Sequence, residues 1–266
     1  MRIGLALSGG AARGIAHIGV LMYLEERGVK PCCIAGTSAG SIVGALYCSG
    51  KNIDQIKENI VKMSWKELIK ITIPRKGLIN SSRLLEVIKE QIGEITFEEL
   101  EIPLIVNAVD LINGEEVVFE EGPVAEAVYA SCAIPGIFTP VKWKGRLLVD
   151  GGLLDNVPAA LMKNRGIDYI IAVNVGAQHP LQKEPDNIFE VLIQSFDIIR
   201  RQRDLPAYEC ADTLIEPDLG DFSFWDNSKL NSIIKRGYDE AKKALDNVNL
   251  DKKQSRLARW LSRRKN

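Results

Sequence analysis

The chain has 266 residues, of which 46% are hydrophobic and 26% are charged, and its formal net charge is −1. This length can bury a substantial core in one large domain, and the ordinary glycine and proline content excludes a fibrous repeat or a disordered chain. The near-neutral charge gives no reason to expect a nucleic acid as a partner.

The cysteines and the apolar runs indicate a cellular compartment. The five cysteines are odd in number and lack metal-ligand spacing with the two histidines, so they predict reduced core residues and no metal site. The apolar run after Met1 is too short for a signal peptide, and no run approaches the ~18 residues of a membrane span. We therefore expect a cytoplasmic location, with membrane contact only at the protein surface.

Strand-like and helix-like segments alternate along the chain. Strands are predicted at 3–8, 32–36, 103–109, 147–149, 169–175 and 213–215. The alternation predicts an α/β fold with a mostly parallel sheet and helices on both faces. Asn113-Gly114 between apolar runs predicts one antiparallel hairpin within 104–120.

Two later segments have helical periodicity. The segment 186–203 carries a broad apolar stripe, which predicts a helix that packs on the sheet. A last helix is predicted at 227–245. One side of it is apolar or small, with Leu230, Ile233, Ile234, Gly237, Ala241 and Leu245.

The first chemical motif is Gly36-Thr37-Ser38-Ala39-Gly40, which matches G-x-S-x-G. An apolar strand precedes it and a helical pattern, 41–48, follows it, as a nucleophile elbow requires. The glycines permit a sharp turn, and the helix start supplies backbone N–H groups. Ser38 is therefore predicted to be a nucleophile at the carboxyl end of a strand; the alternative is an ordinary N-cap serine.

A glycine-rich turn, Ser8 to Gly14, follows the first strand. Its N–H groups can cradle a phosphate, form an oxyanion hole, or simply make a tight turn. It fits neither GxxxxGK[ST] nor GxGxxG, so a nucleotide-binding protein is weakly supported. A nucleophile elbow one βα unit later favours the oxyanion hole.

The serine needs a proton acceptor, and there are three candidates. Asp150 ends an apolar strand and precedes Gly151-Gly152, although Asp-Gly is also a hairpin turn signal. His17 lies on the apolar face of its helix, which predicts a packed core residue. His179 gives the order Ser38, Asp150, His179, which is that of an α/β-hydrolase triad and remains the alternative.

Together these three segments resemble the patatin-like phospholipase family, closely its small bacterial members. The family pattern is a G-G-G-x-R/K-G loop, a G-x-S-x-G elbow and a D-G-G/A segment, found here at 9–14, 36–40 and 150–152. The resemblance implies a three-layer αβα fold and hydrolysis of acyl esters in phospholipids, lysophospholipids or related lipids. It implies a Ser-Asp dyad without histidine and without a metal or other cofactor.

Carried over by position, the resemblance makes Ser38 the nucleophile and Asp150 the base. It implies an oxyanion hole at Gly9, Gly10 and Ala11, where Ala11 replaces the usual third glycine. Arg13 would orient the loop or a lipid headgroup. The supporting glycines would be Gly36, Gly40 and Gly151. Because a carboxylate is a weak base for serine, we expect burial to raise its proton affinity.

We expect one acyl hydrolase domain at 1–250 and a basic tail at 251–266, which carries seven Lys or Arg against Asp251. The tail is either a short helix that rests on anionic lipid or a solvated terminus. The segment 63–76 is either a lid or an ordinary core helix and loop. A regulatory protein that keeps the scaffold without turnover is the alternative from another functional class.

Overall fold

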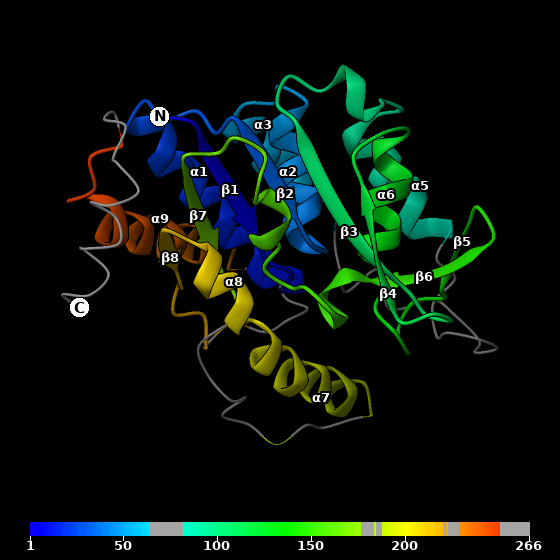
Figure 1. Ribbon diagram of the computed structural model, residues 1–266. Helices are drawn as coiled ribbons and strands as arrows, with labels where there is room; N and C mark the ends of the chain where they lie inside the picture. The colour runs from blue at the N-terminus through cyan, green and yellow to red at the C-terminus, as the bar shows by residue number, and fades with distance from the viewer. Residues whose placement is uncertain (64–81, 177–183, 185–187, 221, 223–228, 251–266) are drawn as a thin grey trace.

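The computed structural model describes residues 1–63, 82–176, 184, 188–220, 222 and 229–250 (Figure 1). His179, the basic tail and nearly all of the segment 63–76 lie outside these residues. The predictions made for them are therefore not tested by the structure.

A single mixed sheet forms the centre of the protein. Its strands are β1 (Ile3–Leu7), β2 (Cys33–Gly36), β3 (Leu104–Asp110), β4 (Glu115–Phe119), β5 (Val141–Trp143), β6 (Arg146–Asp150), β7 (Tyr169–Val173) and β8 (Thr213–Ile215). The order is β5-β6-β3-β2-β1-β7-β8, and β4 also pairs with β3. The strands β1, β2, β3, β7 and β8 are parallel, and β4, β5 and β6 join by antiparallel pairing. The predicted strands and the hairpin are confirmed.

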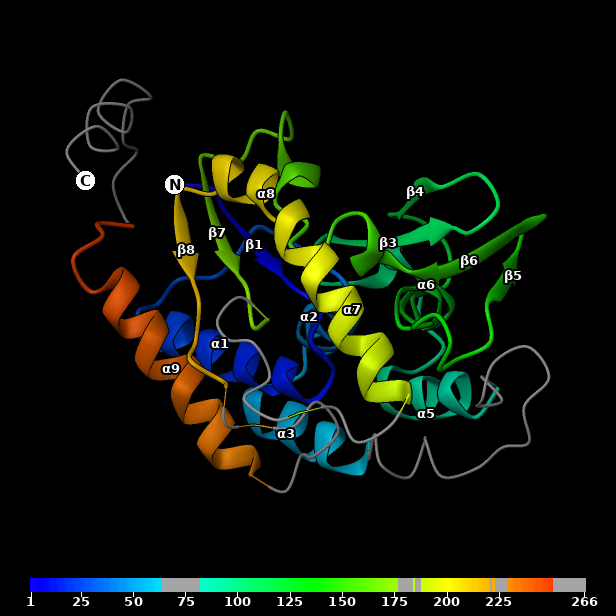
Figure 2. The same cartoon turned by 90° about the horizontal axis from the view of Figure 1, so that it is seen from below.

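Helices cover both faces of this sheet. They are α1 (Ala16–Glu26), α2 (Ala39–Cys48), α3 (Ile53–Lys62), α5 (Ser82–Ile92), α6 (Val124–Ser131), α7 (Ile188–Arg203), α8 (Leu205–Cys210) and α9 (Leu230–Leu245). Figure 2 shows α8 on one side of β1 and β7, and α1 with α9 on the other. The fold is a three-layer αβα arrangement.

The two faces of the sheet differ in the size of their side chains. Leu5 and Leu7 of β1 belong to the large core beneath the long helices. Ala6, between them, points to the smaller core, which contains Ala159 and Ala207. Successive strand residues point to opposite faces, so large residues fill one side and small residues let short helices lie close on the other.

Helix α7 forms as predicted, but the prediction that it packs on the sheet is wrong. It contacts α8 and the 3-10 helix η3 (Gly151–Leu153), and lies at the carboxyl ends of the parallel strands (Figure 1). Val191, Ile198 and Ile199 are exposed. Both sheet faces are already filled by other elements, so α7 covers the edge where the strands end.

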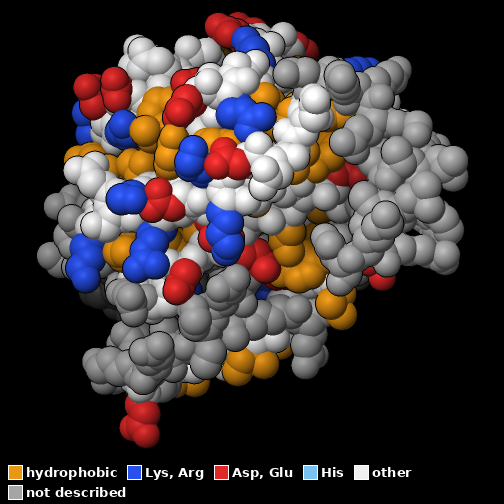
Figure 3. Space-filling view, turned by 90° about the vertical axis from the view of Figure 1, so that its left-hand side faces the viewer, with side chains coloured by type: hydrophobic (Ala, Val, Ile, Leu, Met, Phe, Trp, Pro, Cys, Tyr) orange, Lys and Arg blue, Asp and Glu red, His pale blue; other side chains and the backbone are white. Residues whose placement is uncertain are grey.

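Helix α9 packs against α1 through two glycines. A Cβ on Gly19 would lie 2.0 Å from the Ile234 carbonyl oxygen, and a Cβ on Gly237 would lie 2.0 Å from the Ala16 carbonyl oxygen. The backbones therefore touch where the helices cross. The outer side of the molecule here mixes both signs of charge with small hydrophobic areas (Figure 3). Lys235 and Asp239 of α9 form an exposed ion pair.

Candidate active site

The candidate site lies where two strands meet end to end. Strand β2 pairs parallel with β3 up to Gly36 opposite Val106, and β6 pairs antiparallel with β3 up to Asp150 opposite Ala108. The other edge of β3 is occupied by β4. The carboxyl ends of β2 and β6 therefore point toward each other along one edge of β3. This arrangement brings Ser38 and Asp150 together.

Ser38 occupies a strained turn between β2 and α2. Its φ is +51° and its ψ is −121°, and only 4% of the residue is exposed. Its backbone N–H donates to the Ser131 hydroxyl at 2.8 Å. Ser38 stands at the N-cap position, yet its side chain makes no capping hydrogen bond. The N-cap interpretation of its hydroxyl is therefore wrong, and the hydroxyl is left for other contacts.

The elbow glycines allow a close approach of backbones. A Cβ on Gly40 would lie 2.2 Å from the Leu7 carbonyl oxygen, and one on Gly36 would lie 2.7 Å from the Ser41 Cα. Gly151 lies similarly close to Asn107, whose Oδ1 would be 2.5 Å from an added Cβ. Larger residues at these positions would push the turn away from β1 and β3.

Asp150 is a buried carboxylate at the end of β6, with 8% of the residue exposed. Its Oδ1 accepts a hydrogen bond from the Gly152 N–H at 2.8 Å. Burial raises the pKa of Asp150 to about 6, although hydrogen bonds from Gly152 and the Ser38 side chain and the charge of Arg200 lower it in part. The predicted rise in proton affinity is confirmed.

The hairpin interpretation of Asp150-Gly151 is wrong, because β6 leads into η3 rather than into a returning strand. The Asp150 side chain caps this short helix through Gly152. The carboxylate is thereby held at the strand end.

The glycine loop turns different N–H groups in different directions. The Gly9 N–H donates to Asn156, to its carbonyl oxygen at 3.2 Å and to its Oδ1 at 3.1 Å. Within the described part of the chain, the N–H groups of Gly10 and Ala11 have no hydrogen-bond partner. Ala11 adopts a φ of +47°, which few residues other than glycine adopt. The donors left for a ligand are therefore those of Gly10 and Ala11.

Arg13 is buried, with 4% of the residue exposed, and its Nε donates to the Phe222 carbonyl oxygen at 3.1 Å. It lies in the 3-10 helix η1 (Ala11–Ile15), which forms the second half of the glycine loop. This position favours the predicted role in orienting the loop over a contact with a lipid headgroup at the surface.

His17 is fully buried, and its Nε2 lies 2.8 Å from the Ser8 carbonyl oxygen. A carbonyl oxygen only accepts, so Nε2 carries the proton. Burial lowers the pKa of His17 to about 4, so the ring stays neutral. The prediction of a packed core histidine is confirmed, and this ring helps to fix the strand end before the loop.

One pocket joins these groups. Ser38 and Asp150 line it together with the loop residues Gly9, Gly10 and Ala11. Its other walls are apolar in part, from Ile134, Pro135, Leu153 and Phe196, and polar in part, from Gly152, Asn156, Asp197 and Arg200. A hydroxyl, a carboxylate, an apolar wall and two N–H donors that have no partner among the described residues therefore share one cavity.

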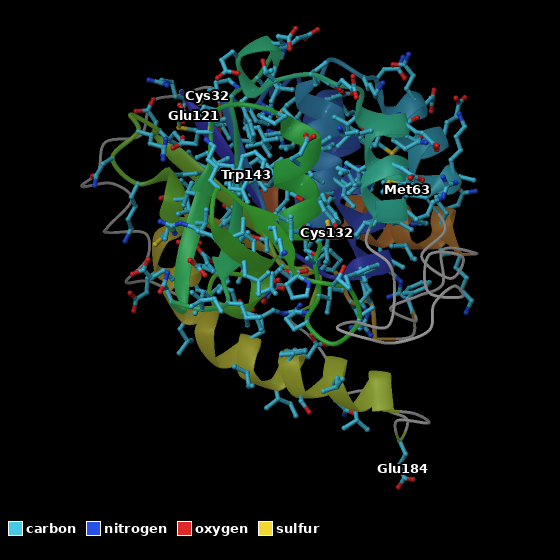
Figure 4. All side chains as sticks on the ribbon, turned by 90° about the vertical axis from the view of Figure 1, so that its right-hand side faces the viewer. Cys32, Met63, Glu121, Cys132, Trp143 and Glu184 are labelled. Carbon is cyan, nitrogen blue, oxygen red and sulfur yellow. The ribbon has the colours of Figure 1, made fainter. Side chains whose placement is uncertain are left out.

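Cys132, labelled in Figure 4, is buried directly after α6. Burial, and next the charge of Asp150, raise the pKa of its thiol, although side-chain hydrogen bonding with Ser41 and Ser38 lowers it in part. A protonated thiol is a poor nucleophile. Cys132 is therefore not activated as a nucleophile.

Sequence reasoning missed Ser131 and Asn156 as parts of this site. Asn156 bonds to a residue 147 positions away, so no local pattern marks it. Asn156 lies close to Asp150 in the sequence, and this proximity is the signal that could have identified it. Among the described residues, no cluster of three or more His, Cys, Asp or Glu side chains is suited to hold a metal ion.

The chain is similar to known proteins in both sequence and fold. Residues 5–163, more than half of the chain, match the family model described as patatin-like phospholipase. An uncharacterised NTE family protein of Mycobacterium tuberculosis is 37% identical over 177 residues, which cover 65% of this chain and 49% of that protein. Lysophospholipase NTE1 of Candida albicans is 36% identical over 181 residues, or 66% of this chain and 13% of that protein.

The chain thus spans about half the length of the mycobacterial relative and a small part of the fungal one. Among solved structures, VipD from Legionella pneumophila superposes with a TM-score of 0.58 at 18% identity, over 92% of this chain and 67% of that one. This likeness supports the fold alone. In the described part of the chain, no helix has the length and apolar character needed to cross a membrane.

Proposed function

Because the chain belongs to the patatin-like phospholipase family, we propose that it hydrolyses acyl esters of lipids, with Ser38 as the nucleophile and Asp150 as its base. The observation that carries this proposal is the pairing of the two groups. Ser38, in the strained turn after β2, and Asp150, at the end of β6, line one pocket. The same pocket holds N–H donors that have no partner among the residues that the structure describes.

The proposed reaction has two halves. The Ser38 Oγ attacks the ester carbonyl carbon while Asp150 accepts the hydroxyl proton, and the N–H groups of Gly10 and Ala11 stabilise the oxyanion. The bond to the alcohol then breaks, and Asp150 returns the proton to the leaving oxygen. A water molecule, deprotonated by Asp150, attacks the acyl-enzyme; the fatty acid leaves and the Ser38 hydroxyl is restored.

The pKa of about 6 suits both halves. A carboxyl group with this pKa is mostly ionised near neutral pH and accepts a proton more readily than an ordinary aspartate. The same group remains acidic enough to protonate the alkoxide that leaves.

The pocket and the relatives support the proposed substrate class. The walls from Ile134, Pro135, Leu153 and Phe196 suit an acyl chain. Relatives are named lysophospholipase and, in Drosophila melanogaster, neuropathy target esterase. We therefore expect phospholipids, lysophospholipids or related lipid esters, reached by peripheral contact of the 1–250 domain with a lipid surface from the cytoplasm.

The test is turnover of a mid-chain chromogenic ester and of a lysophospholipid. Ser38→Ala and Asp150→Asn are expected to lose roughly 10³-fold or more in kcat. Ser49→Ala is the matched control, because this serine caps the other end of α2 through the Leu46 carbonyl oxygen. His179→Ala is expected to stay near wild type.

Two results would contradict the proposal in different ways. A comparable loss in His179→Ala would replace the dyad with a Ser-Asp-His triad. A wild-type protein without turnover, and without labelling of Ser38 by a fluorophosphonate, would favour a regulatory protein on the same scaffold.

A further inference from the structure

Asn156 connects the glycine loop to the segment that carries Asp150. It is 2% exposed and lies shortly after η3. Both its carbonyl oxygen and its Oδ1 accept the Gly9 N–H. A Cβ added to Gly152 would lie 3.1 Å from the Asn156 Oδ1 and 3.1 Å from the Asp150 Oδ1. The amide of Asn156 and the carboxylate of Asp150 therefore flank the same glycine.

The orientation of this amide is determined by Gly9. Rotating the amide by half a turn would place the Nδ2 hydrogens against the Gly9 N–H, donor against donor. The Oδ1 must therefore face Gly9, and the Nδ2 must point away from it. Since Gly9 uses its N–H on Asn156, the N–H groups of Gly10 and Ala11 are the loop donors that have no partner in the described part of the chain.

The Nδ2 group itself is buried and has no hydrogen-bond partner among the described residues. A buried donor without a partner destabilises a fold, so such groups are rare, and an ordered water or a ligand commonly supplies the acceptor. Asn156 lines the same pocket as Ser38 and Asp150. The ester group of a substrate is an acceptor that would enter this pocket.

We propose that Asn156 acts twice in the reaction: its Oδ1 positions the glycine loop, and its Nδ2 donates a hydrogen bond to the ester group of the bound substrate. This inference rests on the proposed function. The donated bond strengthens as negative charge develops on the ester oxygen, so its loss lowers kcat more than it raises KM. A carboxylate in the same place would repel that charge.

Two substitutions separate the two roles. Asn156→Asp keeps an oxygen for the Gly9 N–H and removes the Nδ2 donor. Asn156→Ala removes both without adding charge. Asn174→Ala is the matched control, because Asn174 is also buried and its Oδ1 accepts a glycine N–H, that of Gly176, at 3.0 Å. Its Nδ2 is already paired with Asp204 and Tyr208.

The measurements are kcat and KM on the chromogenic ester, and the midpoint of thermal unfolding. Both Asn156 variants are expected to lose roughly 10²-fold in kcat with KM within about threefold of wild type. All three variants should unfold earlier than wild type, Asn156→Asp because it buries a carboxylate next to Asp150. Asn174→Ala should keep a kcat near that of wild type. This result would show that a loss of stability alone does not lower activity.

Near-wild-type kcat in Asn156→Asp would overturn the donor role, because the retained oxygen would then suffice. The donor role is also overturned if Asn156→Ala keeps a kcat within about tenfold of wild type while Asn156→Asp does not. The introduced negative charge alone would then explain the loss of kcat in Asn156→Asp. A wild-type protein that neither turns over ester nor reacts with a fluorophosphonate would instead remove the proposed function, and this inference with it.

Discussion

Asp150 links the burial of a single carboxylate to the pH dependence of the reaction. The base must be ionised to accept the Ser38 proton, and burial raises the pKa of Asp150 to about 6. We therefore expect kcat/KM for a neutral ester to rise with pH and to level off above about pH 6, because protonation at lower pH removes the base. The profile should be recorded between about pH 5 and pH 8.

A histidine base would give a similar acidic limb, so the decisive comparison is His179→Ala. The same profile in that variant excludes His179 as the titrating group. A flat profile in the wild type would show that no group with this pKa limits the reaction.

The residues of the site differ in how far the sequence predicts them. Ser38 and Asp150 stand in short local patterns, between apolar strands and glycines, so their neighbours in the chain are enough to mark them. Asn156 and Ser131 act on Gly9 and Ser38 from distant parts of the chain. Such contacts depend on the packing of whole elements, which local periodicity does not specify.

At the scale of elements, the strands and α9 follow from periodicity because each buries a regular set of residues. The periodicity of α7 also predicts a helix, but it does not predict where that helix packs. Its apolar stripe is compatible with a sheet face or with the rim of a pocket, and only the occupancy of both faces by other helices decides between them.

The crossing of α1 and α9 gives a prediction at this scale. Gly237→Ala should lower the free energy of unfolding by about 2–3 kcal/mol, because the new methyl group would meet the Ala16 backbone rather than a movable side chain. The gain in helix propensity of roughly 1 kcal/mol is smaller than this cost. Denaturant unfolding measures the change.

Ser232→Ala is the control for that experiment, since Ser232 is exposed on the same helix. Its stability should remain within about 0.5 kcal/mol of wild type. If Gly237→Ala is as stable as this control, the two helices do not touch at the glycines.

For the whole molecule, the folding unit is larger than the stretch that matches the family. The match ends at residue 163, yet α9 covers α1 with Ile233, Ile234 and Leu245. Exposing three such side chains costs about 5–9 kcal/mol, comparable with the total stability of a typical domain. A chain cut after Pro217 should therefore lose cooperative thermal unfolding and bind a hydrophobic dye.

A chain cut after Leu250 is the control, and it tests the proposed domain of residues 1–250. It should unfold at the same temperature as the full chain, since α9 remains and Leu250 is buried. Cooperative unfolding of the shorter chain would show that α9 is dispensable for the fold.

The shared edge of β3 has a consequence for how the sequence can change over evolution. Because β2 and β6 both hydrogen-bond to that edge, the backbone of β3 sets the spacing between Ser38 and Asp150. A residue inserted in the turn at Lys144-Gly145 leaves this pairing intact, whereas one inserted between Leu148 and Asp150 would turn the carboxylate to the opposite face. Surface loops of this protein can thus vary in length while the two reacting groups keep their separation.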